Sequence, residues 1–156
     1  MARKKNALRK HFIAPYVEGE EEPKELLRLG INIATIEDDS EESTESAGDY
    51  AGDGNEVEVL TGRSEKWKVD GTYDPTDPAQ KLIAGMKRTN TDSERLIWHK
   101  IEENDGSIVI GVAKALEIVA GGGDATEYET FSCSLAYTAT PKVTSGKPDP
   151  SPEIGA

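Results

Sequence analysis

The chain has 156 residues, a net charge of −12, 35% hydrophobic residues and one cysteine. This length suits about one domain, a single cysteine excludes an intrachain disulfide, and no apolar run reaches the roughly 20 residues that span a bilayer. The negative charge argues against non-specific nucleic-acid binding, which requires clustered lysine and arginine. No apolar region follows the basic start, so we expect neither a secretory signal nor membrane insertion.

Residues 1–25 predict an N-terminal arm. Its first part is basic, with positive charges at Arg3, Lys4, Lys5, Arg9 and Lys10. Two prolines follow, with an acidic run between them, which indicates irregular structure rather than a packed element.

A β-domain is predicted over residues 26–140, and it begins with a strand at 27–33, where apolar residues alternate with a period of two. The next segment, 38–55, is rich in serine, glycine and acids and predicts a long mobile loop. Between Arg28 and Arg63 there is no basic residue, and ten acids in this gap supply ten of the twelve net negative charges: Glu37, Asp38, Asp39, Glu41, Glu42, Glu45, Asp49, Asp53, Glu56 and Glu58.

Further strands are predicted at 56–60 and 67–69, before a single helix at about 77–88. Asp77 is a good N-cap, Pro78 suits the first helical position, and Gln80 stands where a capping box needs it. Because a helix of this length is marginal alone, it must pack against a sheet.

The second half is predicted as strands, with a turn at 103–106 and another break at the three glycines 121–123. After Pro141 the composition predicts an extended C-terminal arm, 141–156. The fold class that follows is mainly β: an antiparallel β-sandwich or barrel with one flanking α-helix, a long acidic loop and extended terminal arms.

Motifs for chemistry are weak. A calcium loop starting at Asp49 fails at two ligand positions, which are occupied by Ala51 and Leu60. Cys133 shares a strand face with apolar residues and is predicted to be a buried thiol. His11 falls in the arm and His99 is expected to face solvent, so neither suggests a metal site. We therefore expect no catalytic residues, no metal, no cofactor and no enzymatic activity.

The region 67–83, WKVDGTYDPTDPAQKLI, resembles the central part of the major tail proteins, or tail tube proteins, of long-tailed siphovirus-type bacteriophages. The resemblance rests on a strand that leads through an Asp/Pro-rich turn into one helix, and on the order of elements over most of the chain. It implies a structural subunit that forms hexameric rings. These rings stack into a tube and conduct DNA during genome delivery.

The same resemblance implies the partners and the location. The partners are further copies of the chain, a tape measure protein, tail terminator and baseplate proteins, and DNA in transient passage. The subunit would be assembled in the host cytoplasm and reside in the virion tail. Arms and loops of such subunits bridge neighbours, so the candidate interface consists of Arg3, Lys4, Lys5, Arg9, Lys10, Asp38, Asp39, Glu41, Glu42, Glu45, Asp49 and Asp53.

Two alternatives remain open from the sequence. One is another virion protein on a similar sandwich, such as a head–tail joining or decoration protein. The other is a monomeric β-sandwich binding module whose acidic segment engages a cation or a basic partner. The edges of the strands distinguish a tube subunit from a monomeric module. A tube subunit needs edges that pair with neighbouring subunits, whereas a monomer must protect its edges.

Overall fold

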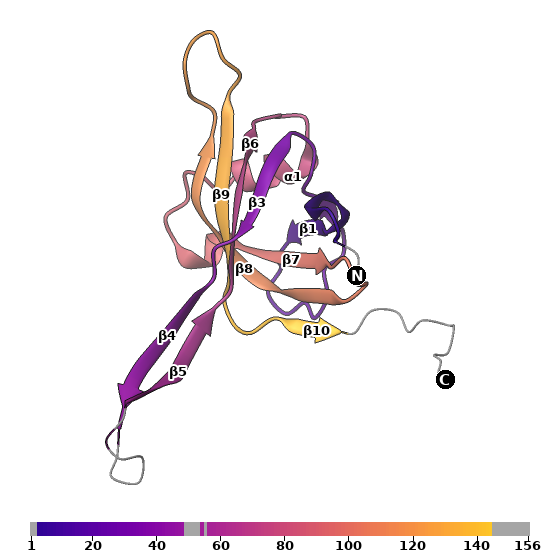
Figure 1. Cartoon of the computed structure of the whole chain (residues 1–156). Helices are drawn as coiled ribbons and strands as arrows, with labels where there is room; N and C mark the ends of the chain where they lie inside the picture. Colours follow the sequence, from indigo (N-terminus) through magenta and orange to yellow (C-terminus); the bar gives the residue numbers. More distant parts are fainter. Residues whose placement is uncertain (1–2, 49–53, 55, 145–156) are drawn as a thin grey trace.

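A computed structural model describes residues 3–48, 54 and 56–144 of the chain. Its main part is one eight-stranded antiparallel sheet that curls into a half-barrel (Figure 1). The strand order is β2-β1-β7-β8-β9-β6-β3, and β10 pairs with β8. The predicted class, mainly β and antiparallel with one flanking helix, is confirmed. The strands are β1 (Lys10–Pro15), β2 (Leu27–Arg28), β3 (Ile33–Asp38), β4 (Glu41–Ala47), β5 (Val57–Ser64), β6 (Lys66–Thr72), β7 (Leu96–Glu102), β8 (Ile108–Ala120), β9 (Thr130–Tyr137) and β10 (Lys142–Thr144).

The core lies on the concave face of the half-barrel, because alternate residues of each strand point inward. In β9, Phe131, Cys133 and Leu135 are buried, as the alternating pattern predicts. They pack with Ile83 of the helix and Val69 of β6. The burial predicted for Cys133 is therefore confirmed.

The helix α1 (Pro78–Ala84) covers one end of this core, and Asp77 caps it by accepting a hydrogen bond from the Gln80 backbone at 3.2 Å. The predicted start is confirmed, but the helix is shorter than 77–88. Residues 85–88 form turns instead. Gln80 also departs from a capping box. Its side chain accepts from the backbone of Asp74 at 2.6 Å and donates to the carbonyls of Ile31 and Thr72.

Two short 3-10 turns, η1 (Asn6–Leu8) and η2 (Asp92–Arg95), complete the elements. The connection after α1 is held by Arg95, whose guanidinium donates to the carbonyls of Thr89 and Ala115. One arginine thus ties the segment after α1, at Thr89, to strand β8, at Ala115.

The predicted strand at 27–33 is wrong, because the chain turns inside it. Asn32 adopts a φ of 60°, which ends the extended run, and β2 and β3 lie at opposite ends of the strand order. Gly71 accommodates this turn, since a Cβ there would lie 2.2 Å from the Asn32 carbonyl oxygen. Alternation of apolar residues indicates extended backbone, but it does not reveal a tight turn that preserves the alternation.

The segment 1–25, expected to be an arm, contains β1 within the sheet. Ile13 and Ala14 are fully buried, and β1 pairs with β7 along its whole length. The strand was not predicted because its apolar stretch is short and follows a run of basic residues, which indicated an irregular segment.

The segment 38–55, expected to be a loop, contains β4. Strand β4 pairs with β5 from Glu41↔Ser64 to Ala47↔Val57 in a separate two-stranded sheet. Serine and glutamate predicted a loop because they bury no apolar surface, but a hairpin ladder needs only paired backbone groups. Of the candidate interface residues, Asp49 and Asp53 lie outside the described residues, as does the part of the predicted C-terminal arm beyond residue 144.

Candidate assembly surfaces

The hairpin of β4 and β5, called the arm from here on, projects away from the half-barrel (Figure 1). Val57, Val59 and Leu60 are 63%, 50% and 57% exposed, and every residue of β5 is exposed. The register places Val59 opposite Glu45, on the face that Val57 shares. The arm therefore presents apolar and acidic side chains that have no role in the core.

Hydrogen bonds hold the root of the arm to the body. The Asp39 backbone donates to the Lys66 carbonyl at 2.8 Å, and the Lys66 backbone donates to the Ser40 hydroxyl at 3.0 Å. The Ser40 side chain also lowers the pKa of Asp38, with further contributions from the Ser40 backbone, Arg63 and Arg9. These contacts continue the β3–β6 ladder up to the arm and set its direction.

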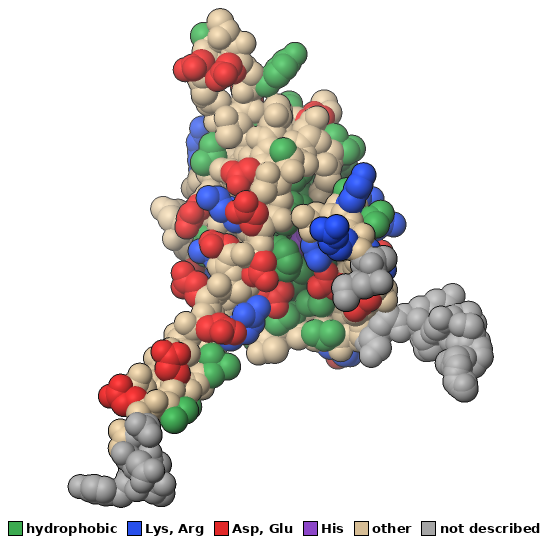
Figure 2. Space-filling view, viewed as in Figure 1, with side chains coloured by type: hydrophobic (Ala, Val, Ile, Leu, Met, Phe, Trp, Pro, Cys, Tyr) green, Lys and Arg blue, Asp and Glu red, His purple; other side chains and the backbone are tan. Residues whose placement is uncertain are grey.

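Negative charge follows the arm (Figure 2). The acids that the structure describes there include Glu41, Glu42, Glu45 and Glu58, and Arg63 pairs with Glu42 at 3.1 Å. Thr61 lies at a bulge in β5 and donates to the Ser43 carbonyl. The bulge increases the local twist of the hairpin.

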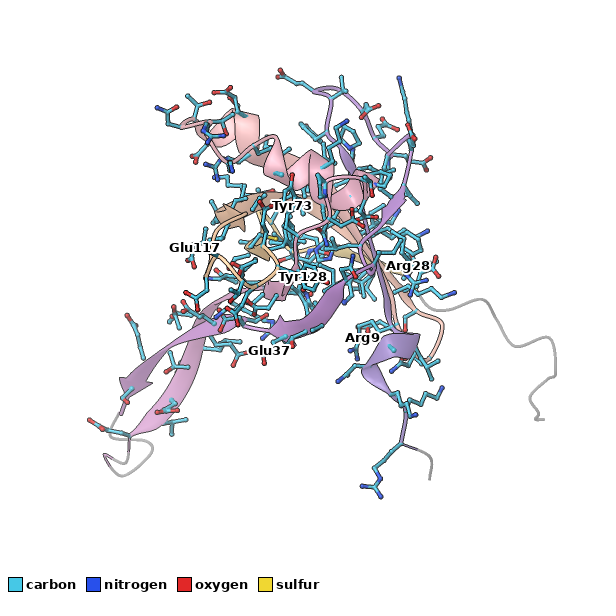
Figure 3. The ribbon with its side chains drawn as sticks, turned by 90° about the horizontal axis from the view of Figure 1, so that it is seen from above. Arg9, Arg28, Glu37, Tyr73, Glu117 and Tyr128 are labelled. Atoms are coloured by element: carbon cyan, nitrogen blue, oxygen red, sulfur yellow. The ribbon has the colours of Figure 1, made fainter. Side chains whose placement is uncertain are left out.

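The basic N-terminal residues lie on another part of the molecule. In Figure 3 Arg9 and Arg28 are on the side that carries the N-terminal turn, whereas the arm extends to the other side. Arg9 pairs with Glu103 at 2.5 Å, and Lys4 donates to the Asn104 carbonyl. Arg3, Lys5 and Lys10 are exposed. Within one chain, the ion pairs seen among the described residues do not join these N-terminal bases to the arm.

A groove of about 190 Å³ lies between the N-terminal turn η1 and β3. Its apolar lining includes Leu29, Ile33 and Ile36, and its charged lining consists of Arg9 and Arg28. None of the described residues that line the groove is acidic. This feature is unusual in a chain with a net charge of −12.

Strand β3 borders the groove with an open edge. It pairs with β6 on one side and with none of the other described strands. Unpaired strand edges readily accept another strand, because their N–H and C=O groups lack partners. The groove therefore combines apolar surface, positive charge and open backbone groups.

His11 lines the groove and packs against His99 in the interior. Both imidazoles are buried, and His11 Nδ1 lies 3.1 Å from His99 Nε2. Two predictions are wrong: that His11 lies in an irregular N-terminal segment, and that His99 faces solvent. Strands β1 and β7 place both rings toward the core. Burial, together with Arg9 and Arg28, lowers the pKa of His11 to about 4. Burial and the nearby His11 hold the pKa of His99 well below its usual value.

Aromatic rings surround this histidine pair. The Tyr137 ring stacks on His99 with centroids 5.2 Å apart, and its hydroxyl donates to the His99 carbonyl at 3.1 Å. Trp67 meets His11 edge-on, and the Arg9 guanidinium lies over the Trp67 ring. Trp67 and Tyr137 belong to a second core cluster, so the two histidine rings act as packing elements beside it.

A larger hollow of about 600 Å³ opens at the root of the arm, with Trp67 and Val109 in its lining. Arg9 and Arg63 also line it, as do Asp38, Glu65, Glu103 and Asp105. Arg9 already pairs with Glu103, so part of this charge is neutralised internally.

The described residues show neither an ionised thiol nor a metal-binding cluster. Burial, with a contribution from Asp70, raises the pKa of the Cys133 thiol to about 12, so this group is protonated near neutral pH. Across the described residues, no three His, Cys, Asp or Glu side chains gather where they could hold a metal ion. In the same part of the chain, no helix is long and apolar enough to cross a membrane.

Comparison with known proteins gives fold-level matches. The sequence matches no protein-family model and no curated protein. A chain from the tail of an empty gene transfer agent particle, solved with C6 symmetry, superposes with a TM-score of 0.65 at 11% identity, over 92% of this chain and 100% of that chain. The chain shares its fold with this tail component.

Two further structures agree. A chain of the native gene transfer agent virion matches with a TM-score of 0.59 at 12% identity, over 92% of this chain and 100% of that chain. A chain of the sheath–tube complex of an extracellular contractile injection system matches with a TM-score of 0.50 at 12% identity, over 87% and 88% of the two chains. At these identities the likeness concerns the fold.

Sequence reasoning missed the groove, the histidine pair and the apolar face of the arm. The alternation of valine with glutamate at 56–60 predicts the strand correctly, but nothing in it reveals that both faces are exposed. The sequence also gives no sign that Arg28 lines a groove, because this depends on β2 and β3 lying at opposite ends of the strand order.

Proposed function

We propose that the chain is a structural, non-enzymatic subunit of a phage-like tail tube. In this proposal six copies form a ring, as in the C6-symmetric tail whose fold the chain shares, and rings stack into a tube. The observation that carries the proposal is the arm. A monomer would gain nothing from a projecting hairpin with three large apolar side chains at least half exposed.

The rest of the tail assembly follows from this role. The tube would enclose a tape measure protein, end at terminator and baseplate proteins, and conduct DNA from a virion assembled in the host cytoplasm. The net charge of −12 supports passage of DNA, because a like-charged subunit does not retain a polyanion.

The direct test is the state of assembly. We expect the purified chain to form sixfold rings or tubes, seen by negative-stain electron microscopy, with a matching mass in solution. A chain that remains monomeric at high concentration, and also with a tape measure protein present, would overturn the proposal.

A deletion separates folding from assembly. Replacing residues 41–64 by Asn-Gly removes the arm and closes the β3–β6 ladder with a short turn. Because Asp38 pairs with Trp67 at the end of this ladder, the body should keep its fold and its cooperative unfolding. We expect the deletion variant to lose tubes. Tubes of normal length from this variant would show that the arm has no part in stacking.

A further inference from the structure

We propose that the groove between η1 and β3 receives the arm of a second copy of the chain, which adds as a strand to the open edge of β3. The inference deepens the proposed function and rests on it, because it requires copies of the chain to assemble. It assigns the receiving surface as well as the segment that enters it.

The apolar surfaces are complementary. Val57 and Val59 stand on one face of β5 at a spacing of two, both at least half exposed. The groove offers Ile33 and Ile36, which are only partly buried, while Leu29, 2% exposed, belongs to the core beneath them. Docking would remove both apolar surfaces from water, and the stabilisation grows with the apolar area that is buried.

The charges are complementary as well. Arg28 lines the groove, has no acidic neighbour in the described lining and belongs to none of the ion pairs seen among the described residues, whereas Arg9 beside it is already paired with Glu103. On the arm, Glu45 lies opposite Val59 and therefore on the face that would enter the groove. Complementary charge of this kind sets the register of an interface and selects the partner.

The backbone completes the match. The edge of β3 toward the groove pairs with no other described strand, and β5 pairs with β4 alone in its own sheet. An extended segment that joins a free edge gains main-chain hydrogen bonds, while alternate side chains fill the adjoining pockets.

The occupant has to come from a second copy. Strand β3 runs directly into the arm, and the hydrogen bonds among Asp39, Ser40 and Lys66 direct the arm away from the body. Figure 3 shows the arm on the opposite side from Arg9 and Arg28. A chain cannot bring its own arm onto β3 without breaking this root.

Cysteine cross-linking tests the contact in assembled protein. Two variants are purified separately: Val59→Cys, on the arm, and Ala34→Cys, at an exposed position of the groove. They are mixed before assembly. We expect a disulfide-linked dimer under mild oxidation, because such a bond forms only where the Cα atoms come within about 7 Å. Cys133 is buried, so the wild-type chain supplies the background.

Two matched controls locate the contact. Glu58→Cys lies on the other face of β5, and Tyr128→Cys lies at a loop position that is 89% exposed and away from the groove. The reference is the cross-linking between Val59→Cys and Ala34→Cys. We expect at least tenfold less when Glu58→Cys replaces Val59→Cys, and at least tenfold less when Tyr128→Cys replaces Ala34→Cys.

A charge exchange gives an independent readout. Arg28→Glu should raise the concentration needed for half-maximal assembly at least tenfold, and adding Glu45→Arg should restore it. Arg88→Glu makes the same charge change at an exposed position outside the groove and should assemble normally.

The outcomes are distinguishable. Normal tubes with no Val59–Ala34 cross-link, and with Arg28→Glu assembling like Arg88→Glu, overturn the groove as the receiving site and leave the tail-tube role intact. A wild-type chain that never assembles overturns both.

Discussion

The half-barrel and the arm are built from the same kind of antiparallel ladder but use their side chains differently. In β9 alternate residues such as Phe131 and Leu135 are fully buried, whereas in β5 every residue is exposed. The body therefore obtains its stability from its own core. The arm has pairing without a core, and a lone two-stranded hairpin is marginal in water. A segment of this kind acquires packing when another chain covers it.

The sharpest test of this difference is to remove apolar groups from each region. Phe131→Ala should lower the free energy of unfolding by about 3–5 kcal/mol, because it leaves a cavity beside Tyr73, Val69 and Leu135. Val59→Ala should change it by no more than about 0.5 kcal/mol. Urea unfolding of the unassembled chain measures both. Equal losses would mean that the arm shares the core of the body.

A second test concerns the polar link between α1 and the sheet. Gln80→Leu removes three hydrogen bonds and leaves the Asp74 amide and two carbonyls without partners, at a cost of about 3 kcal/mol. Lys81→Leu, at an exposed position of the same helix, is the matched control and should be nearly neutral. Thermal unfolding compares the two variants. If both lose the same stability, the three hydrogen bonds do not hold the helix to the sheet.

A third test uses pH. The folded pKa of His11 is about 4, below its usual 6.5, so the unfolded chain binds protons that the folded chain excludes. Stability is therefore fully present above pH 6.5 and is lost as the pH falls toward 4, by roughly 3 kcal/mol from this group. His11→Gln should reduce the slope of stability against pH between these values. A profile identical to that of the wild type would show that His11 does not titrate as its burial requires.

The smallest effect is expected on the helix cap. Asp77→Ala should cost about 1 kcal/mol, since its carboxylate accepts from the Gln80 backbone. Asp77→Asn keeps an acceptor and should cost less than half as much. Thermal unfolding of the two variants measures the difference, and a fall of equal size in both would assign the effect to charge instead of the cap.

Much of the fold could be predicted from local patterns. Alternation of apolar residues identifies the interior face of β9, and the Asp77-Pro78 pair identifies the start of α1. The candidate interface was predicted from the family resemblance together with charge, as a basic start and an acidic segment. Its pairing between copies stays a prediction, and Arg28, Val57 and Val59 had no signal that singled them out.

Three features follow from the order of residues alone: the β-rich class, the single capped helix and the concentration of negative charge between Arg28 and Arg63. Propensity, capping and charge are local properties, which is why a sequence reveals them. The separation of β2 and β3 to opposite ends of the sheet, the contact of His11 with His99 and the pairing of the acidic segment into an arm appear only in the folded chain. These features depend on which strands pair and on the turn at Asn32, and both are settled by packing between residues far apart in the chain.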